Sequence, residues 1–512
     1  MKRALTYLAL SAAAPAALQA QGSSYEQLQA FSGVLSHLRA NYVDSVETGQ
    51  LVRAAIYGML RSLDPHSYYV SRADFEIRRA WIEGRLASPG ISVESADGVP
   101  TVVSVQSGSA AQKAGILPGD RLLQVDSTWT DGLGARDVET RLIGEKGSRV
   151  KVTVERGPEV SPDTLIVSLK RNPGRDRFVS GPHLVDARTA YVRLEEFNVP
   201  AVKELKDAIK QAQGQKARQL ILDVRGNPGG DVRALAEIAS FFLPEAKQIF
   251  KTEGRKKTGV DDMHVLKAGD FTTLPLILLV DESSASASEM LAGALQDHDR
   301  ALIVGRRTFG KALMQSALPL PNGDIIWLTT ARIVSPSGRV IQRRYQGVTT
   351  EEYYKGRGSS GVPQDSTGSF RTDSGRIVRA GGGIRPDIER AAAPLPVWFS
   401  VAADTGLVYG VADSVATTLP EGDAGRQAWQ ADSSRWDAML VTPFMARVKA
   451  QVSPRAEADA ALRARLGRIL GSRAAEVRYG VEAGETFRAT NDPDVRLALA
   501  QFPQLARLLK TP

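Results

Sequence analysis

The sequence predicts a multidomain α/β protein, and three observations lead to this fold class. The chain has 512 residues, which is too long for a single hydrophobic core. Apolar residues recur at helical spacing before residue 84, alternate at strand spacing over residues 84–172, and form continuous runs between helical segments over residues 173–394. Residues 395–512 are rich in Ala and Arg and return to a helical pattern. We therefore expect two different β-containing domains with helical segments at both ends of the chain.

The first twenty residues have the layout of a secretory signal peptide. Basic Lys2 and Arg3 precede an apolar stretch from Ala4 to Leu18, and Ala20 offers a small residue for cleavage. An uncleaved membrane anchor is the alternative, although the stretch is short for a membrane span. We predict that residues 1–20 are a signal peptide and that the protein is exported, to a periplasm or outside the cell. Association with the inner membrane remains open.

Composition excludes several kinds of chemistry. The chain has no cysteine, which rules out disulfides, zinc–thiolate sites, a cysteine nucleophile and a lipid anchor on cysteine. The net charge is +8, and Lys and Arg are scattered along the chain without a basic stripe that contains aromatic residues. Weak attraction to anionic surfaces is expected, but not nucleic-acid binding.

Residues 21–83 are predicted to be an N-terminal helical segment. Leu28, Phe31, Leu35 and Leu38 fall on one face of a helix, and Asp64-Pro65-His66 ends the pattern.

Residues 84–172 are predicted to be a small β-domain. Short strands such as Thr101–Val105 and Val150–Glu155 alternate with turns, and the string Ala114-Gly-Ile-Leu-Pro-Gly-Asp-Arg-Leu-Leu123 resembles a PDZ domain. PDZ domains bind a chain terminus as an added strand, with the carboxylate held by backbone N–H groups of the loop that precedes the strand, here Ser88–Ile91. The alternative is a β-domain without a ligand, and Pro89 removes one donor from this loop. The predicted peptide-binding residues are Gly90, Ile91, Ser92, Val93, Val138 and Leu142.

Residues 173–394 are predicted to be a layered α/β core. Leu220–Val224 and Leu276–Val280 are apolar throughout, as expected for parallel strands that are buried on both faces. Val202, Leu205 and Ile209 lie on one face of an intervening helix, so the expected arrangement is βαβ.

A run of small hydroxyl residues follows the second of these strands. It reads Asp281-Glu-Ser-Ser-Ala-Ser-Ala-Ser-Glu289, and Ser286 and Glu289 have the spacing of a helix capping box. A serine at a helix start lies beside free N–H groups that favour a developing oxyanion. The alternative is a plain helix cap. A serine hydroxyl also needs a base, and Lys311, in Phe309-Gly-Lys311, is the candidate because burial lowers the pKa of a lysine.

Two further features favour catalysis. The amide of Gln315 could hold the lysine amine in line with the serine. Val224-Arg-Gly-Asn-Pro-Gly-Gly230 ends a buried strand, and its adjacent glycines allow N–H groups to face a carbonyl oxygen. This loop lacks the Gly-Lys-Ser/Thr of a phosphate-binding P-loop.

Taken together, these motifs resemble the carboxyl-terminal processing, or tail-specific, proteases. The matching motifs include Ser62–Ser67, the PDZ string, Arg225–Gly230, Ser284–Glu289, Gly305–Lys311 and Gly383–Asp387. The resemblance implies a serine peptidase with Ser286 as nucleophile, Lys311 as base and Gln315 as the orienting residue. It also implies an oxyanion hole made by the N–H of Ala287 and of Gly229 or Gly230, and a core similar to the crotonase ββα spiral. No metal or cofactor is implied, and the expected partners are polypeptides recognised through their C-termini.

Three other interpretations remain. His298 could suggest a Ser–His–Asp hydrolase, but helical rise places it about three turns from Ser286, and we interpret it as an exposed helix-end residue; His66 is interpreted as structural. A PDZ adaptor or chaperone with an inactive protease core is the main alternative, and a crotonase-type acyl-CoA enzyme is another. The sequence leaves open the natural substrate, the resting state, homo-oligomerisation and the role of residues 395–512.

Overall fold

The structure is a computed structural model of the chain. It describes residues 14–82, 85–96, 99–105, 109–116, 120–131, 133, 135–156, 163–172, 178–257, 261–348, 353, 368–391, 395–404 and 407–510. The first part of the predicted signal peptide, residues 1–13, lies outside these ranges. None of the helices in the described ranges combines the length and the apolarity that a membrane crossing requires.

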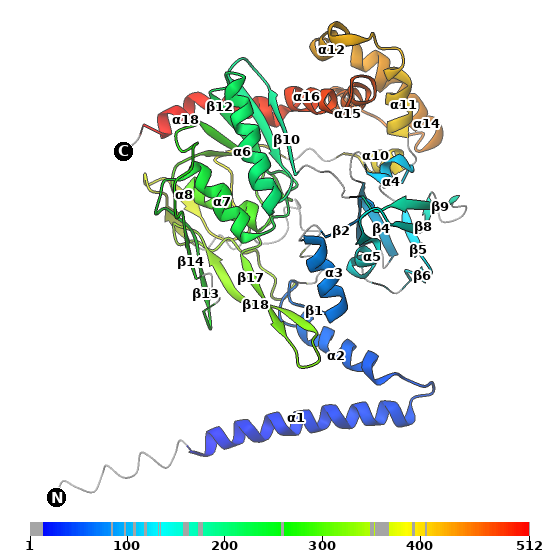
Figure 1. Cartoon of the computed structure of the whole chain (residues 1–512), viewed down its shortest axis with the longest axis vertical. Helices are drawn as coiled ribbons and strands as arrows, with labels where there is room; N and C mark the ends of the chain where they lie inside the picture. Colours follow the sequence, from blue (N-terminus) through cyan, green and yellow to red (C-terminus); the bar gives the residue numbers. More distant parts are fainter. Residues whose placement is uncertain are drawn as a thin grey trace, which may run out of the picture. The chain divides into compact units, whose positions relative to one another are not determined.

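The chain divides into two compact units, and the smaller one consists of residues 1–70 and 317–328. Its elements include α1 (Ala14–Asn41), α2 (Thr48–Arg61) and β1 (Tyr68–Val70), shown in Figure 1. β1 pairs antiparallel with the first part of β18 (Ile325–Val334). The turn before β1 depends on Asp64, whose carboxylate accepts the backbone N–H of His66 and of Ser67, each at 2.8 Å. The predicted helix break is therefore a turn built on a carboxylate.

The larger unit begins with α3 (Arg72–Ile82) and continues into the small β-domain. A six-stranded antiparallel sheet has the order β3-β4-β5-β8-β9, with β6 added to β5, while β2 pairs with β7. The bounds are β2 (Leu86–Ala87), β3 (Ile91–Ala96), β4 (Val99–Val105), α4 (Ala110–Lys113), β5 (Arg121–Val125), β6 (Thr128–Trp129), α5 (Ala135–Leu142), β7 (Gly144–Glu145), β8 (Arg149–Arg156) and β9 (Asp163–Lys170). In this sheet β3 is an edge strand.

The central sheet of the core has six strands in the order β10-β11-β12-β15-β16-β21. All neighbours from β11 to β21 are parallel, and β10 is antiparallel to β11. The bounds are β10 (Val179–Leu184), β11 (Thr189–Leu194), α6 (Val199–Gly214), β12 (Gln219–Asp223), α7 (Val232–Phe242), β15 (Leu276–Val280), α8 (Ala287–Asp297), β16 (Leu302–Gly305) and β21 (Ile388–Glu389).

This sheet is covered on both faces, which explains its continuous apolar strands. Along β15, Leu276, Leu278 and Val280 belong to the cluster that contains the apolar faces of α6, α7 and α8. The residues between them, Ile277 and Leu279, belong to a second cluster with side chains of the C-terminal helices. Successive residues of a strand point to opposite faces, so the sheet needs two covering layers. The C-terminal segment supplies one of them.

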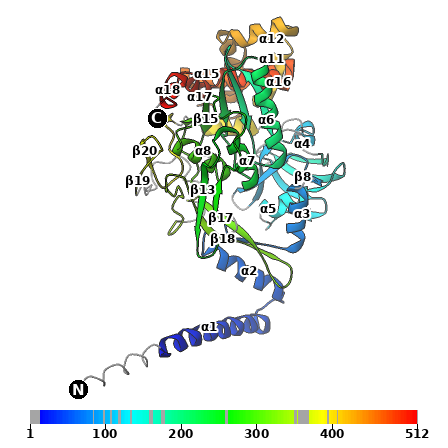
Figure 2. The ribbon, with the colours of Figure 1, turned by 60° about the vertical axis from the view of Figure 1, so that its left-hand side comes forward.

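A second sheet of the core is antiparallel. β18 pairs with β17 (Leu313–Pro319) and, from Ala331 onward, with β13 (Gln248–Gly254), which in turn pairs with β14 (Asp262–His264). β19 (Ser369–Arg371) and β20 (Ile377–Arg379) form a separate hairpin, visible in Figure 2.

The C-terminal segment is helical, as the sequence predicts. Trp429, Trp436 and Phe487 belong to its own hydrophobic cluster, and its last helices contribute to the second cluster beneath the central sheet. The bounds are α10 (Val397–Asp404), α11 (Leu407–Ala416), α12 (Gly422–Ala431), α13 (Ser434–Trp436), the π-helix η1 (Asp437–Val441), α14 (Thr442–Gln451), α15 (Ala460–Tyr479), α16 (Val481–Asn491), α17 (Pro493–Leu499) and α18 (Phe502–Leu508). The predicted mixture of α/β and helical parts is thus confirmed.

Candidate active site

Three serines at alternate positions, Ser284, Ser286 and Ser288, lie at the start of α8. Two of them have structural roles. The hydroxyl of Ser284 donates to the carbonyl of Val224 at 2.8 Å, and that of Ser288 donates to the carbonyl of Asn227 at 3.0 Å. Both serines are fully buried. They fasten the serine run to the glycine-rich loop after β12. The middle serine, Ser286, is only partly buried and can offer its hydroxyl for chemistry.

Ser286 has an unusual backbone. Its φ of 54° and ψ of −114° lie where residues other than glycine are rarely found. Such strain persists only when the surroundings enforce it, and it is concentrated at functional sites. Ser286 is the N-cap of α8, so it stands beside Ala287, whose N–H belongs to the first turn and has no acceptor within the helix.

Glu289 joins the serine to the lysine loop. Its carboxylate accepts the N–H of Ser286 at 3.0 Å and that of Lys311 at 2.8 Å. It also accepts the N–H of Gly310 at 2.6 Å and the hydroxyl of Thr308 at 2.5 Å. Burial raises the pKa of Glu289 to about 7, although these four hydrogen bonds favour the anion. One buried carboxylate therefore holds the backbones of Ser286 and Lys311 together.

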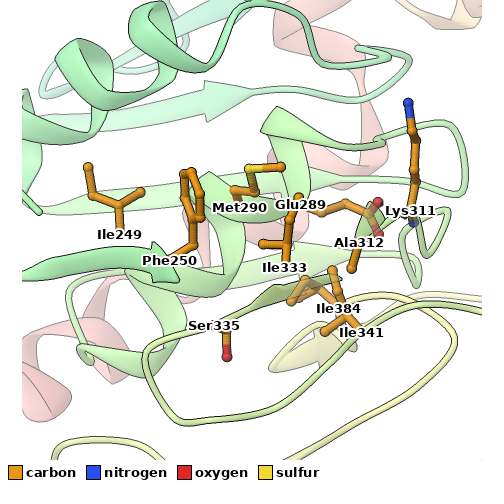
Figure 3. Close-up of a pocket in the computed structure, with 10 residues that line it drawn as sticks. All are labelled: Ile249, Phe250, Glu289, Met290, Lys311, Ala312, Ile333, Ser335, Ile341 and Ile384. Atoms are coloured by element: carbon orange, nitrogen blue, oxygen red, sulfur yellow. Dashed lines mark hydrogen bonds between the residues drawn. The ribbon is translucent and has the colours of Figure 1, made fainter. Parts of the chain in front are cut away.

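The lysine loop is pinned on other sides as well. The N–H of Phe309 donates to the carbonyl of Ser284 at 3.0 Å, and that of Ala312 donates to Gln342 Oε1 at 2.7 Å. Lys311 itself is partly buried. Figure 3 shows the Glu289 carboxylate beside the backbone of Lys311, while the lysine side chain extends away from the isoleucines of an adjoining apolar pocket.

The glycine-rich loop touches the serine directly. Gly229 has a φ of 103°, and a Cβ placed on it would lie 2.8 Å from Ser286 Cβ and 2.8 Å from the nitrogen of Ala287. Gly230 has a φ of 141°, and a Cβ there would lie 2.2 Å from the carbonyl oxygen of Phe197. No larger residue fits at either position, so the glycines permit the close approach that the sequence predicts.

Of the two glycines predicted as oxyanion donors, Gly229 has its N–H engaged within its own loop. Its N–H donates to the side-chain Oδ1 of Asn227 at 2.8 Å. Asn227 is fully buried, and its amide nitrogen donates to the carbonyl of Leu194 at 2.9 Å. The sequence interpretation missed this role, although a short amide side chain two residues before a glycine is a common local acceptor. Gly230 and Ala287 remain the predicted donors.

Comparison with known proteins decides the family. Residues 188–353 match Peptidase family S41, and residues 88–166 match the PDZ domain. The carboxy-terminal-processing protease of Bartonella bacilliformis is 34% identical over 325 residues, which cover 62% of this chain and 74% of that protein. The chain belongs to the carboxy-terminal-processing proteases.

Other members of the family are similar over a comparable share of the chain. Carboxyl-terminal-processing peptidase 2, chloroplastic, of Arabidopsis thaliana is 32% identical over 324 residues, covering 60% of this chain and 61% of that protein. Carboxy-terminal processing protease CtpA of Bacillus subtilis is 30% identical over 308 residues, covering 60% of this chain and 65% of that protein. The chain is thus a serine-type peptidase that contains a PDZ domain.

Gln315, the residue predicted to orient Lys311, forms hydrogen bonds with neighbouring residues of the core. Gln315 Nε2 donates to Thr329 Oγ1 at 3.2 Å and to the carbonyl of Leu313 at 3.3 Å, so its action on Lys311 stays a prediction.

His298 lies at the far end of α8, with Nδ1 2.9 Å from Asp373 and Nε2 2.8 Å from the carbonyl of Gln248. Its side chain is only 8% exposed, so the prediction of an exposed histidine is wrong. Both ring nitrogens are engaged far from Ser286, which opposes a Ser–His–Asp hydrolase.

In the PDZ domain, several predicted peptide-binding residues belong to the core instead. Val138 and Leu142 of α5 are buried with Ile91 and Val93 of β3 in one hydrophobic cluster. In this structure Val138 and Leu142 pack within the domain, and their contact with a peptide stays a prediction. The helix residue that reaches the edge of β3 is Glu139.

Two backbone donors of the predicted peptide site are occupied from within the domain. Glu139 Oε1 accepts the N–H of Val93 at 3.0 Å. In the loop before β3, the N–H of Gly90 donates to Ser88 Oγ at 3.0 Å. Ser92 lies opposite Ser104 in the β3–β4 ladder. A bound peptide would have to replace the Glu139 and Ser88 contacts.

Proposed function

We propose that this protein is an exported serine endopeptidase that cleaves polypeptides from their C-terminal end by Ser–Lys acyl transfer. The observation that carries the proposal is the Glu289 carboxylate, which binds the backbone N–H of both Ser286 and Lys311. A shared buried acceptor keeps nucleophile and base on adjoining loops. A glutamate that served only to cap the helix would not need to accept the backbone N–H of Lys311, which lies 25 positions after Ser286 in the sequence.

The reaction proceeds in two halves. Lys311, as a neutral amine, accepts the proton of Ser286 Oγ while the oxygen attacks the peptide carbonyl. The N–H groups of Ala287 and Gly230 hold the oxyanion of the tetrahedral intermediate. Lys311 then gives the proton to the leaving amine, the C–N bond breaks, and an acyl-enzyme ester remains. A water molecule, deprotonated by Lys311, attacks the ester. The bond between the acyl carbon and Ser286 Oγ breaks, Lys311 returns the proton to Ser286 Oγ, and the new carboxyl terminus is released.

Gln315 is proposed to align the lysine amine, and the PDZ domain is proposed to capture the substrate's C-terminus on the edge of β3. Export is proposed from the charged start and apolar stretch of residues 1–20. The domain limits at residues 83, 172 and 394 and a crotonase-type spiral for the core belong to the same proposal. Polypeptides are the proposed substrates, without nucleic acid or a cofactor.

The main alternative is an inactive protease scaffold that acts as a PDZ adaptor, and fluorophosphonate labelling separates the two. The probe should label the wild type, and Ser286→Ala should lose both labelling and cleavage of an unfolded polypeptide. Ser283→Ala is the matched control, because it removes a neighbouring hydroxyl of the same run and should be labelled like the wild type. Labelling that persists in Ser286→Ala, or a folded wild type without any cleavage, would support the adaptor.

A further inference from the structure

We propose that Asp494, in the C-terminal helical segment, is a positioning residue of the active site. It holds Arg225 and Arg306, the arginines that begin the glycine-rich loop and the lysine loop. The inference rests on the proposed function and assigns part of the catalytic centre to residues 395–512. These residues lie outside the stretch that matches Peptidase family S41.

The strand order brings these arginines to one place. Arg225 comes two residues after β12, Arg306 directly after β16 and Arg390 directly after β21. These strands are parallel members of the same sheet, so their carboxyl ends lie on one edge. Ligands and catalytic groups collect at this edge in α/β sheets. Asp494, the second residue of α17, meets all three arginines there.

The contacts are short and buried. Arg225 Nη1 donates to Asp494 Oδ2 at 2.7 Å, and Arg306 Nη1 donates to the same oxygen at 3.3 Å. Arg390 Nη1 donates to the other oxygen, Oδ1. The neighbouring Asp492 accepts from Arg225 Nη2 at 2.7 Å. Asp494 is 2% exposed, so its carboxylate is buried among these partners.

The charge of Asp494 suits this role. Burial alone would raise its pKa, but the hydrogen bond from Arg390 and the charges of Arg225, Arg390 and Arg306 outweigh it and lower the pKa. The group is therefore an anion at neutral pH. Without it, three partly buried guanidinium groups would each lose an acceptor.

Arg225 and Arg306 each stand a few residues before a loop that carries a predicted catalytic group. Arg225 stands four positions before Gly229, and Arg306 stands five before Lys311. Arg306 Nε also donates to Glu282 at 2.6 Å, at the start of the serine run. A shift of Arg225 or Arg306 would therefore move the loops that carry the oxyanion donors and the base.

Asp281 also joins the serine run to the glycine-rich loop. Asp281 Oδ1 accepts the N–H of Gly226 at 2.9 Å and that of Ser284 at 3.0 Å. Misplacing reacting groups by about 1 Å can cost roughly a hundredfold in rate. The loss of Asp494 is thus expected to act on turnover rather than on substrate binding.

The test uses full-length protein and a short peptide substrate cleaved at saturation. Asp494→Asn should lower kcat about tenfold or more with KM changed less than about threefold, and it should slow fluorophosphonate labelling of Ser286 in parallel. Asp437→Asn is the matched control, because Asp437 pairs with Arg463 at 2.7 Å inside the C-terminal helices. It should keep the wild-type kcat. Circular dichroism and melting curves ensure that every variant is folded at the assay temperature.

A double-mutant cycle identifies the route. If Asp494 acts through Arg306, Asp494→Asn should lower kcat much less in an Arg306→Gln background than in the wild type. A folded Asp494→Asn with wild-type kcat overturns the inference, and so does full additivity with both Arg306→Gln and Arg225→Gln.

Should Asp494→Asn fail to fold, Asp492→Asn decides, because this residue is more exposed and also binds Arg225. A several-fold loss of kcat at constant KM supports the inference, and an unchanged kcat overturns it. A wild type that lacks Ser286-dependent cleavage would instead refute the proposed function.

Discussion

Two glutamates, one in the protease core and one in the PDZ domain, accept backbone N–H groups in very different ways. Glu289 is fully buried and accepts four hydrogen bonds from the serine run and the lysine loop. Glu139 is partly buried and accepts the N–H of Val93 on an edge strand. The first glutamate is a brace that joins the serine run to the lysine loop. The second occupies a donor that a peptide strand would use.

The glycine-containing loops of these two regions share one feature. The N–H of Gly229 is bound by the buried Asn227 side chain, and the N–H of Gly90 is bound by the Ser88 hydroxyl. In both regions a donor that the sequence assigns to substrate is satisfied by its own loop. Exchanging one acceptor for another has a small net free energy of about 1 kcal/mol, so substrate can displace such contacts where it can reach them. The PDZ edge differs from the core in how easily substrate can reach these N–H donors, more than in the strength of their hydrogen bonds.

The strongest test of the core is the base. Lys311→Ala should lower kcat by roughly a thousandfold, because a positioned general base contributes about 10²–10⁴-fold. The fold should persist, since Glu289 binds the backbone N–H of Lys311 and the substitution keeps that N–H. Peptide cleavage and thermal melting measure the two effects.

The control for this variant is Lys251→Ala. Lys251 is 43% exposed, pairs with Glu253 on the same strand, and should be dispensable for turnover. If Lys311→Ala cleaved peptide at the wild-type rate, the base would have to be sought elsewhere.

The brace itself gives the next largest effect. Glu289→Gln places an amide NH₂ opposite N–H donors, so we expect roughly a hundredfold loss of kcat and a lower free energy of unfolding. The pKa of Glu289, about 7, lies above its ordinary value of 4.5. The folded chain therefore retains a proton that the unfolded chain loses between these values. This stabilisation is fully present below about pH 4.5 and is lost as the pH rises through about 7.

Melting curves across this pH range test the assignment. Between about pH 5 and pH 8, the free energy of unfolding of the wild type should fall by up to about 3 kcal/mol relative to that of Glu289→Gln. A constant difference would mean that Glu289 does not titrate in this window.

Much of this centre could be predicted from the sequence, because backbone requirements leave strong local signals. Gly229 and Gly230 stand where no Cβ fits, and Ser286 stands at a helix start after a buried strand. These features follow from local spacing and from residue types. The buried acceptor Glu289 was visible only as a capping residue, since its bonds to Gly310 and Lys311 depend on how distant loops pack.

Long-range pairing explains the other differences. Asp494 follows Arg225 by 269 positions, and no local pattern connects them. In the PDZ domain the helical period placed Val138 and Leu142 correctly on one face, but that face packs into the core. Periodicity identifies an apolar face without saying what covers it.

The smallest expected effect concerns the PDZ edge. Glu139→Ala should free the N–H of Val93 and remove a negative charge from the path of a peptide carboxylate. In an Ser286→Ala background, which prevents cleavage, a fluorescent C-terminal peptide should bind several-fold more tightly, since one displaced hydrogen bond is worth about 1 kcal/mol. Glu145→Ala, which removes an exposed carboxylate from β7, controls for the change in net charge. Turnover of a short peptide that does not need the PDZ domain should be the same in Glu139→Ala and in the wild type.

Weaker peptide binding by Glu139→Ala would be equally informative about the edge of β3. Peptide binding strand-wise to β3 needs the N–H groups of that edge, so a carboxylate that merely occupies one of them competes with the peptide. A carboxylate that stays beside the bound peptide would instead attract a basic side chain, and its removal would weaken the binding of Lys- or Arg-containing peptides alone. Tighter binding of all peptides in Glu139→Ala therefore supports occupation of the edge, and selective weakening of the basic ones makes Glu139 a specificity contact.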